Sequence, residues 1–357
     1  MGLPTINITF KQLAQTVNTR AERGILCIIV QDDTNDAFVY KTYTSAQDVS
    51  ESDYTADNYA AIVRAFLASP HKVVVARMAT ADLVADVPEV LANTTFNWAC
   101  AVPAAFQSAV ADAVKSMNAN SKRARKAKAL VAGVSGANDM HVVNVANTDV
   151  TLVGEENTTA INLYLPRLGG LLAACPLTES VTYKELDDLD EVSEIADIDA
   201  SIDGGNFCLF KDDDTIRVAR GVDTLQTITG DLTEDMKKIT VVEAMDMIQE
   251  DIVKTFKVAY LGRVKNSADN QALFISEIIE YFTELAEENI IDISYTDTVA
   301  QIDVAAMREA WTNDGIDVSD LTDAQVKAKT YRATIFVNAT CRVLDAMEDL
   351  SMTIALG

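Results

Sequence analysis

The sequence predicts an α/β region followed by an α+β region. The first is a mixed or parallel sheet with flanking helices, the second is a C-terminal α+β module, and a strand is predicted at each end of the chain. Short apolar runs alternate with helical stretches between residues 25 and 153, which is typical of strands joined by crossover helices. From residue 206 onward the pattern changes to a hairpin and long amphipathic helices. Both chain ends alternate polar and apolar residues, as strands with one buried face do.

In the first region, continuous apolar runs such as Ile25–Val30 predict strands that are covered on both faces. Helices are predicted where apolar residues recur at helical spacing, and Asp57 is the candidate N-cap of the first one. In chain order we expect strands at 25–30, 72–76, 96–102, 129–133 and 141–145, and helices at 57–68, 81–93, 104–119 and 157–174. Residues 185–203 form an acidic connector, and a domain boundary is expected near its end.

The second region begins with a predicted hairpin, residues 206–219, whose tip is the acidic turn Lys211–Asp214. Two long helices with apolar stripes follow at about 233–261 and 268–288. A helix at 304–312 and a β-rich tail from Lys329 complete this module.

The two ends each present one apolar face. Ends normally fray unless something holds them, and a strand leaves backbone groups unpaired until it joins a sheet. Both ends can pair inside their own domain, or they can add strands to neighbouring copies of the chain. The polar residues 11–23 suit an extended linker after the first strand. The apolar positions are Ile6, Ile8 and Phe10 in the N-terminal strand, and Leu350, Met352, Ile354 and Leu356 in the C-terminal strand.

Composition excludes several classes of function. The 357 residues include 29 Lys+Arg and 54 Asp+Glu, a net charge of −25, which disfavours binding to nucleic acid or to anionic lipid. No apolar run is long enough to span a membrane, and the first residues do not resemble a signal peptide. We therefore expect no nucleic-acid partner, no membrane insertion, and synthesis in a cytoplasm.

Signals for catalysis or metal binding are weak. The five cysteines form no CxxC pair and are interpreted as buried thiols, and His71 and His141 are interpreted as structural. Residues 197–204 resemble the start of a calcium loop, but Ile202 and Cys208 stand where Gly and Glu are needed. No phosphate-binding, zinc-protease or nucleophile-elbow motif occurs. The sequence therefore predicts no catalytic residue, no metal site and no cofactor.

A basic run interrupts the acidic background near residue 125. It is either the solvated end of a helix, favoured by the helix dipole, or a contact for an acidic patch of another subunit. Its members are Lys122, Arg123, Arg125, Lys126 and Lys128.

Several motifs together resemble contractile phage tail sheath proteins. The chain start at 2–8, the turn Gly221-Val222-Asp223-Thr224-Leu225, the helix at 241–256 and the loop at 260–266 carry the resemblance. In that family a Gly-Val-Asn-Thr-Leu type turn precedes the long helix, so Asp223 replaces the commoner Asn. The resemblance covers both ends and most of 206–357, whereas 32–203 match only in layout. The chain looks like the compact sheath of a simple myophage or an R-type bacteriocin.

This resemblance implies a structural protein rather than an enzyme. Stacked rings in a helical array would surround a tail tube and contract to drive it through a bacterial envelope, with the tube, baseplate and tail terminator proteins as partners. The particle would be a virion tail or a bacteriocin, assembled in the bacterial cytoplasm. The resemblance favours terminal arms that add strands to the C-terminal sheet of a third subunit. These strands would stay paired during contraction, while linkers at 11–23 and about 345–349 absorb the movement. A non-contractile shell or tube protein and an α/β enzyme are the alternatives.

The implied division of the chain is a 1–23 arm and linker, a 24–203 α/β domain, a 204–348 α+β sheath core and a 349–357 arm strand. A basic patch would face the tube if the outer surface of the tube is acidic. Its candidate residues are Lys327, Lys329 and Arg332.

Overall fold

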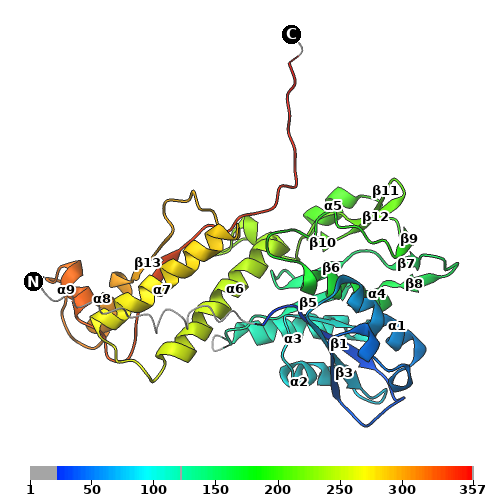
Figure 1. The fold of residues 1–357 in the computed structure, drawn as a ribbon, viewed down its shortest axis with the longest axis horizontal. Helices are drawn as coiled ribbons and strands as arrows, with labels where there is room; N and C mark the ends of the chain where they lie inside the picture. The colour runs from blue at the N-terminus through cyan, green and yellow to red at the C-terminus, as the bar shows by residue number, and fades with distance from the viewer. Residues whose placement is uncertain (1–21, 121–122, 356–357) are drawn as a thin grey trace, which may run out of the picture. The chain divides into compact units, whose positions relative to one another are not determined.

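The computed structural model describes residues 22–120 and 123–355 (Figure 1). The chain forms two compact units, here named the sheet unit (residues 22–246 and 345–355) and the helical unit (residues 247–344). Helix α6 (Ile239–Thr255) runs from the first unit into the second. The units do not follow the boundary expected at residue 203, because β10 (Asn206–Phe207) pairs with β6 (Val142–Val145) inside the main sheet.

The sheet unit is built on a seven-stranded sheet in the order β10-β6-β5-β4-β1-β3-β2. Neighbouring strands are parallel except β2, which is antiparallel to β3, and this confirms the mixed sheet with flanking helices. The remaining strands of this sheet are β1 (Ile25–Gln31), β2 (Tyr40–Tyr43), β3 (Lys72–Met78), β4 (Trp98–Ala101) and β5 (Lys128–Ala132). A three-stranded sheet contains β7 (Asp149–Leu152), β8 (Thr158–Ala160) and β9 (Leu189–Val192), and the hairpin consists of β11 (Leu209–Asp212) and β12 (Thr215–Val218).

Alternating residues of β1 belong to two hydrophobic clusters, one on each face of the sheet. Leu26, Ile28 and Val30 pack with α1 (Ala56–Ala65) and α4 (Ile161–Ala174). Ile25, Cys27 and Ile29 pack on the other face with α2 (Val87–Ala92) and α3 (Gln107–Ala119). Gly170 allows α4 to approach α1, since a Cβ atom there would lie 2.0 Å from the carbonyl oxygen of Ala65.

Two local predictions differ from the structure. Helix α1 begins after Thr55, so Asp57 lies in its first turn and is not the N-cap. The acidic segment 185–203 is more than a connector, because it contributes β9 and helix α5 (Ile198–Asp203). Asp197, at the start of the apparent calcium loop, caps α5 by accepting a hydrogen bond from the Ala200 N–H.

The helical unit contains the end of α6, a π-helical turn (Phe256–Tyr260) and helix α7 (Ala268–Glu287). Ile302, Met307 and Val326 form a small apolar core there. The remaining elements are β13 (Val299–Ile302), α8 (Val304–Asn313), α9 (Asp323–Ala328) and β14 (Val337–Thr340).

Candidate assembly interface

The predicted C-terminal arm leaves its apolar face exposed in a single subunit. Residues 350–355 join no helix or strand of the described chain. Leu350, Met352 and Ile354 are 87%, 68% and 69% exposed. Leu356 of the same face and the N-terminal set Ile6, Ile8 and Phe10 lie outside the described residues. An apolar row of this kind is costly in water and suits burial against another surface.

The helical unit contains a two-stranded antiparallel sheet. β13 pairs with β14 from Val299 opposite Thr340 to Ile302 opposite Val337. Ala300 and Ile302 are buried, whereas Val299 and Gln301 are exposed, so the sheet has one apolar and one solvated face. Among the described residues no third strand pairs with either outer edge. Unpaired N–H and C=O groups along such edges can accept additional strands.

The segments at the bases of both arms are held on the sheet unit. Glu22 lies 2.6 Å from Lys72 Nζ and 2.8 Å from His71 Nε2, and Arg23 forms an ion pair with Glu243. Residues 345–349 were predicted to be a linker that absorbs movement. In the structure this segment makes ion pairs and hydrogen bonds to the sheet unit, the most buried of which involve Glu348.

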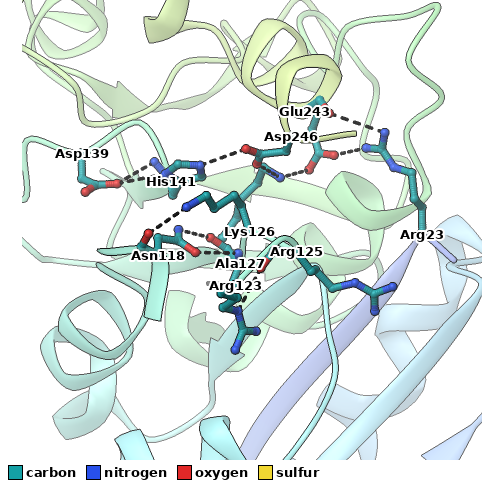
Figure 2. A network of polar contacts seen from close by, with 11 residues as sticks. Arg23, Asn118, Arg123, Arg125, Lys126, Ala127, Asp139, His141, Glu243 and Asp246 are labelled. Carbon is teal, nitrogen blue, oxygen red and sulfur yellow. Dashed lines mark hydrogen bonds and ion pairs between the residues drawn. The ribbon is translucent and has the colours of Figure 1, made fainter. Parts of the chain in front are cut away.

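A buried polar network attaches the first turns of α6 to the sheet (Figure 2). Lys128 in β5 is 3% exposed, and its Nζ lies 2.6 Å from Asp246 Oδ2 and 3.1 Å from Glu243 Oε1. His141 lies between two carboxylates, with Nε2 3.2 Å from Asp246 and Nδ1 3.6 Å from Asp139. Burial lowers the pKa of His141, but the hydrogen bonds to Asp139 and Asp246 outweigh it and raise that pKa. The network supports the structural interpretation of His141.

The basic run near residue 125 is not uniformly a solvated helix end. Lys128 is buried, which contradicts that interpretation for this residue. Lys126 Nζ donates to the Asn118 carbonyl oxygen over 2.8 Å near the end of α3, as a cation at a helix C-terminus does. Arg123 Nε donates to the carbonyl oxygen of Arg125 over 2.9 Å. The run therefore contributes at least two contacts within its own subunit.

Asp223 is fully buried at the position where the resemblance leads one to expect Asn. Its Oδ1 accepts a hydrogen bond from the Leu225 N–H over 2.9 Å, and its buried Oδ2 has no partner among the described residues. Burial raises the pKa of Asp223 to about 8, so the carboxyl group is protonated at neutral pH and resembles the neutral Asn amide.

An Asp223→Asn variant should therefore lose a pH dependence of stability. Because the folded-state pKa of this acid is raised to about 8, the wild-type chain loses stability as pH rises from about 4 to about 8. The Asn side chain does not titrate. Thermal unfolding should show similar melting temperatures near pH 4 and a higher one for the variant at pH 9. Equal pH profiles would contradict the assignment of a protonated carboxyl group.

The predicted basic patch lies in the helical unit beside two aromatic rings. Lys329 Nζ is 4.7 Å from the centre of the Trp311 ring, and the Arg332 guanidinium is 5.5 Å from the centre of the Tyr331 ring. Arg332 also forms an ion pair of 2.7 Å with Asp314, while Lys327 lies in the last turn of α9. Two of the three cations are thus partly committed to contacts within the chain.

Within residues 22–120 and 123–355, no three His, Cys, Asp or Glu side chains group as metal ligands. Across the same ranges no helix is long and apolar enough to cross a membrane. The acidic turn forms the predicted tip of the hairpin, where Asp213 adopts a positive φ of 52°. Sequence reasoning missed Glu348, because its partners Ser180 and Thr182 lie far away in the chain.

Three comparisons with known proteins agree. Residues 231–357 match the family model described as the phage tail sheath C-terminal domain. A protein of Clostridium phage phiCD119 with the name tail sheath protein is 31% identical, over 99% of this chain and 99% of its own length.

Solved structures share the fold at low sequence identity. The sheath tail protein of Desulfitobacterium hafniense superposes with a TM-score of 0.72 at 16% identity, covering 97% of this chain and 98% of that one. The helical sheath of the anti-feeding prophage in its contracted state gives a TM-score of 0.71 at 12% identity, covering 99% of each chain.

Proposed function

The chain belongs to the phage tail sheath protein family, and from this premise we propose how it assembles and works. It is a structural subunit of a contractile tail sheath, a component of a tail particle, and it acts as an oligomer rather than as an enzyme. In the finer proposal, rings of subunits stack in a helical array around the tail tube. Contraction of the array drives the tube through a bacterial envelope. The tube, baseplate and tail terminator proteins are the proposed partners.

Strand exchange between subunits is the proposed means of assembly. The proposal is carried by the presence, in the same chain, of an exposed apolar segment and of a small sheet that can accept another strand. The donor is the exposed apolar face of 350–355, and the acceptor is the β13–β14 sheet, which has no third strand among the described residues. An added strand with the same alternation would place its apolar side chains on the side of Ala300 and Ile302.

The energetics suit a lattice better than a pair of subunits. Each buried apolar side chain contributes about 1.5–3 kcal/mol, while ordering each backbone residue costs about 1–2 kcal/mol. A single arm is therefore only modestly favourable. Several arms hold each subunit in a lattice, and the effective concentration of later contacts is high. The arms can then stay paired while the bodies of the subunits move.

The N-terminal arm gives the direct test. A chain without residues 1–10 should fold, as judged by circular dichroism, but should form no tubes in electron micrographs. The conditions are those in which the full chain assembles, with and without the tail tube as template. Replacing Thr5, Asn7 and Thr9 by Ser keeps the apolar face and should leave assembly intact. Normal tubes from the truncated chain would contradict the proposed N-terminal arm.

The tube-facing surface is proposed to include Lys327, Lys329 and Arg332. Lys329 and Arg332 lie beside aromatic rings in the same small unit as Lys327, which supports a single patch. Charge complementarity to an acidic tube would steer the subunit and set its register. Binding of the isolated subunit to tubes should then weaken steeply as salt increases.

A further inference from the structure

Residues 345–349, at the base of the C-terminal arm, include one side chain that is almost completely buried, Glu348. The Glu348 side chain is 4% exposed, although the neighbouring Asp349 side chain is 77% exposed and the residue before it, Met347, is fully exposed. A carboxylate buried this far is stable only when its charge and its oxygen atoms are matched by partners. The surface that receives it therefore has the properties of a binding site.

Both oxygens of Glu348 are satisfied by the sheet unit. Oε1 accepts hydrogen bonds from the hydroxyl groups of Thr182 (2.6 Å) and Ser180 (3.0 Å). Oε2 lies 3.2 Å from Lys238 Nζ and 3.8 Å from Arg220 Nε. We name these four residues the Glu348 cradle: Ser180, Thr182, Arg220 and Lys238.

Backbone N–H groups orient the hydroxyl donors of the cradle. The Gly221 N–H donates to Thr182 Oγ1 over 2.9 Å, and the Thr182 N–H donates to Ser180 Oγ over 3.1 Å. Each hydroxyl oxygen thus accepts a backbone N–H, and the Thr182 proton is left for Glu348. The single proton of the Ser180 hydroxyl is shared between Thr182 Oγ1, at 2.9 Å, and Glu348 Oε1. Glycine is required at 221, since a Cβ atom there would lie 2.8 Å from a methyl carbon of Val181.

The same turn positions the cations. Val222 forms an antiparallel bridge with Lys238, and the Ile239 N–H donates to the Gly221 carbonyl oxygen over 3.1 Å. Lys238 is thereby fixed beside Arg220 at the start of α6. The Gly221–Leu225 motif, which the sequence analysis singled out, thus has a local purpose in building this site.

Two exposed acids extend the contact. Asp345 forms an ion pair with Lys238, and Asp349 lies 2.6 Å from Arg220 Nη2. Burial raises the pKa of Glu348, but hydrogen bonds from Thr182 and Lys238 outweigh it and lower that pKa below the usual value. Glu348 is therefore ionised at neutral pH, when both cations are charged.

We propose that the Glu348 cradle is a carboxylate-binding latch that fixes residues 345–349 on the sheet unit and sets the pivot of the C-terminal arm after residue 349. The direction in which the arm leaves the subunit is then determined by the sheet unit. That this segment carries an arm rests on the proposed function, whereas the latch itself does not.

The latch can be measured in the isolated, full-length subunit. Nitroxide labels at Met347→Cys and Ser116→Cys report the distance between the segment and α3, which is part of the same unit. Cys175 and Cys341, which are partly exposed, are replaced by Ala, and the buried Cys27, Cys100 and Cys208 are retained. Double electron–electron resonance should give one narrow distance distribution.

Glu348→Gln should broaden this distribution about twofold or more, because the buried charge-assisted contacts are lost. Asp349→Asn removes the same charge one residue away, but from an exposed carboxylate, and should leave the width nearly unchanged. Lys238→Gln removes a partner of Glu348 and should also broaden the distribution. It tests the same contact if the Glu348→Gln chain does not fold.

An unchanged width in both Glu348→Gln and Lys238→Gln would overturn the latch. Equal broadening by Asp349→Asn would also overturn it, because loss of charge in the segment would then suffice. Neither result depends on tube formation, so failure of the latch and failure of the sheath assignment are separate outcomes.

Discussion

A Met352→Asp, Ile354→Asp double variant is expected to fold normally and to remain unassembled. Both side chains are exposed in the single subunit, so the substitutions remove no intramolecular packing. In the proposed lattice, each arm loses two buried apolar groups, about 3–6 kcal/mol, which lowers its equilibrium constant by about 10²–10⁴. Burying the new carboxylates adds to this cost. Sedimentation and electron microscopy should show subunits without tubes.

A matched control exists because a strand presents alternate residues to opposite faces. Ser351→Asp with Thr353→Asp adds the same charge to the same segment, but on the predicted solvated face. This control should assemble. Tubes formed by the Met352, Ile354 variant would show that this face is not buried in the lattice. If both variants fail to form tubes, the added negative charge alone would explain the loss of assembly.

Lys128→Met should strongly destabilise the sheet unit. Removing the cation leaves the buried carboxylates of Asp246 and Glu243 without their shared partner. Breaking a buried ion pair from one side costs about 3–5 kcal/mol. Urea denaturation of the unassembled subunit should show a clear fall in the transition midpoint, with α6 released from the sheet.

Lys126→Met is the control for this variant, since the side chain lies two residues away and bonds one carbonyl oxygen. A loss of about 1 kcal/mol is expected there. Adding Asp246→Leu to Lys128→Met removes one of the two buried carboxylates that lost their shared cation, and it should recover part of the lost stability. A midpoint for Lys128→Met no lower than that of Lys126→Met would mean that the network does not hold α6.

The sequence was most informative where burial is continuous along the chain. β1 and β3 consist mostly of buried apolar residues. Such a run predicts a buried strand whichever elements pack against its two faces. β9 was missed because Asp190 and Glu191 point to solvent, and only its end residues show the buried side. An acidic strand of this kind looks like a loop when read by itself.

Long-range pairing accounts for two further errors. Lys128 belongs to a basic run whose other described members, Arg123, Arg125 and Lys126, are half-buried. The carboxylates that allow the burial of Lys128 lie far away at residues 243 and 246. The same holds for Glu348, whose partners at 180 and 182 lie 168 and 166 residues earlier. No local pattern carries this information. The fold class was predictable, but these buried electrostatic contacts were not.

The residues of the Glu348 cradle are also synthesised earlier than Glu348 itself. Lys238 precedes Glu348 by 110 residues, so the cradle leaves the ribosome well before the glutamate that fills it. Domains generally fold in the order in which they emerge. The part of the sheet unit before residue 247 can therefore fold with an empty cradle, which Glu348 fills later. In the proposed lattice, a chain that stops before Glu348 would lack both the latch and the arm and would not assemble.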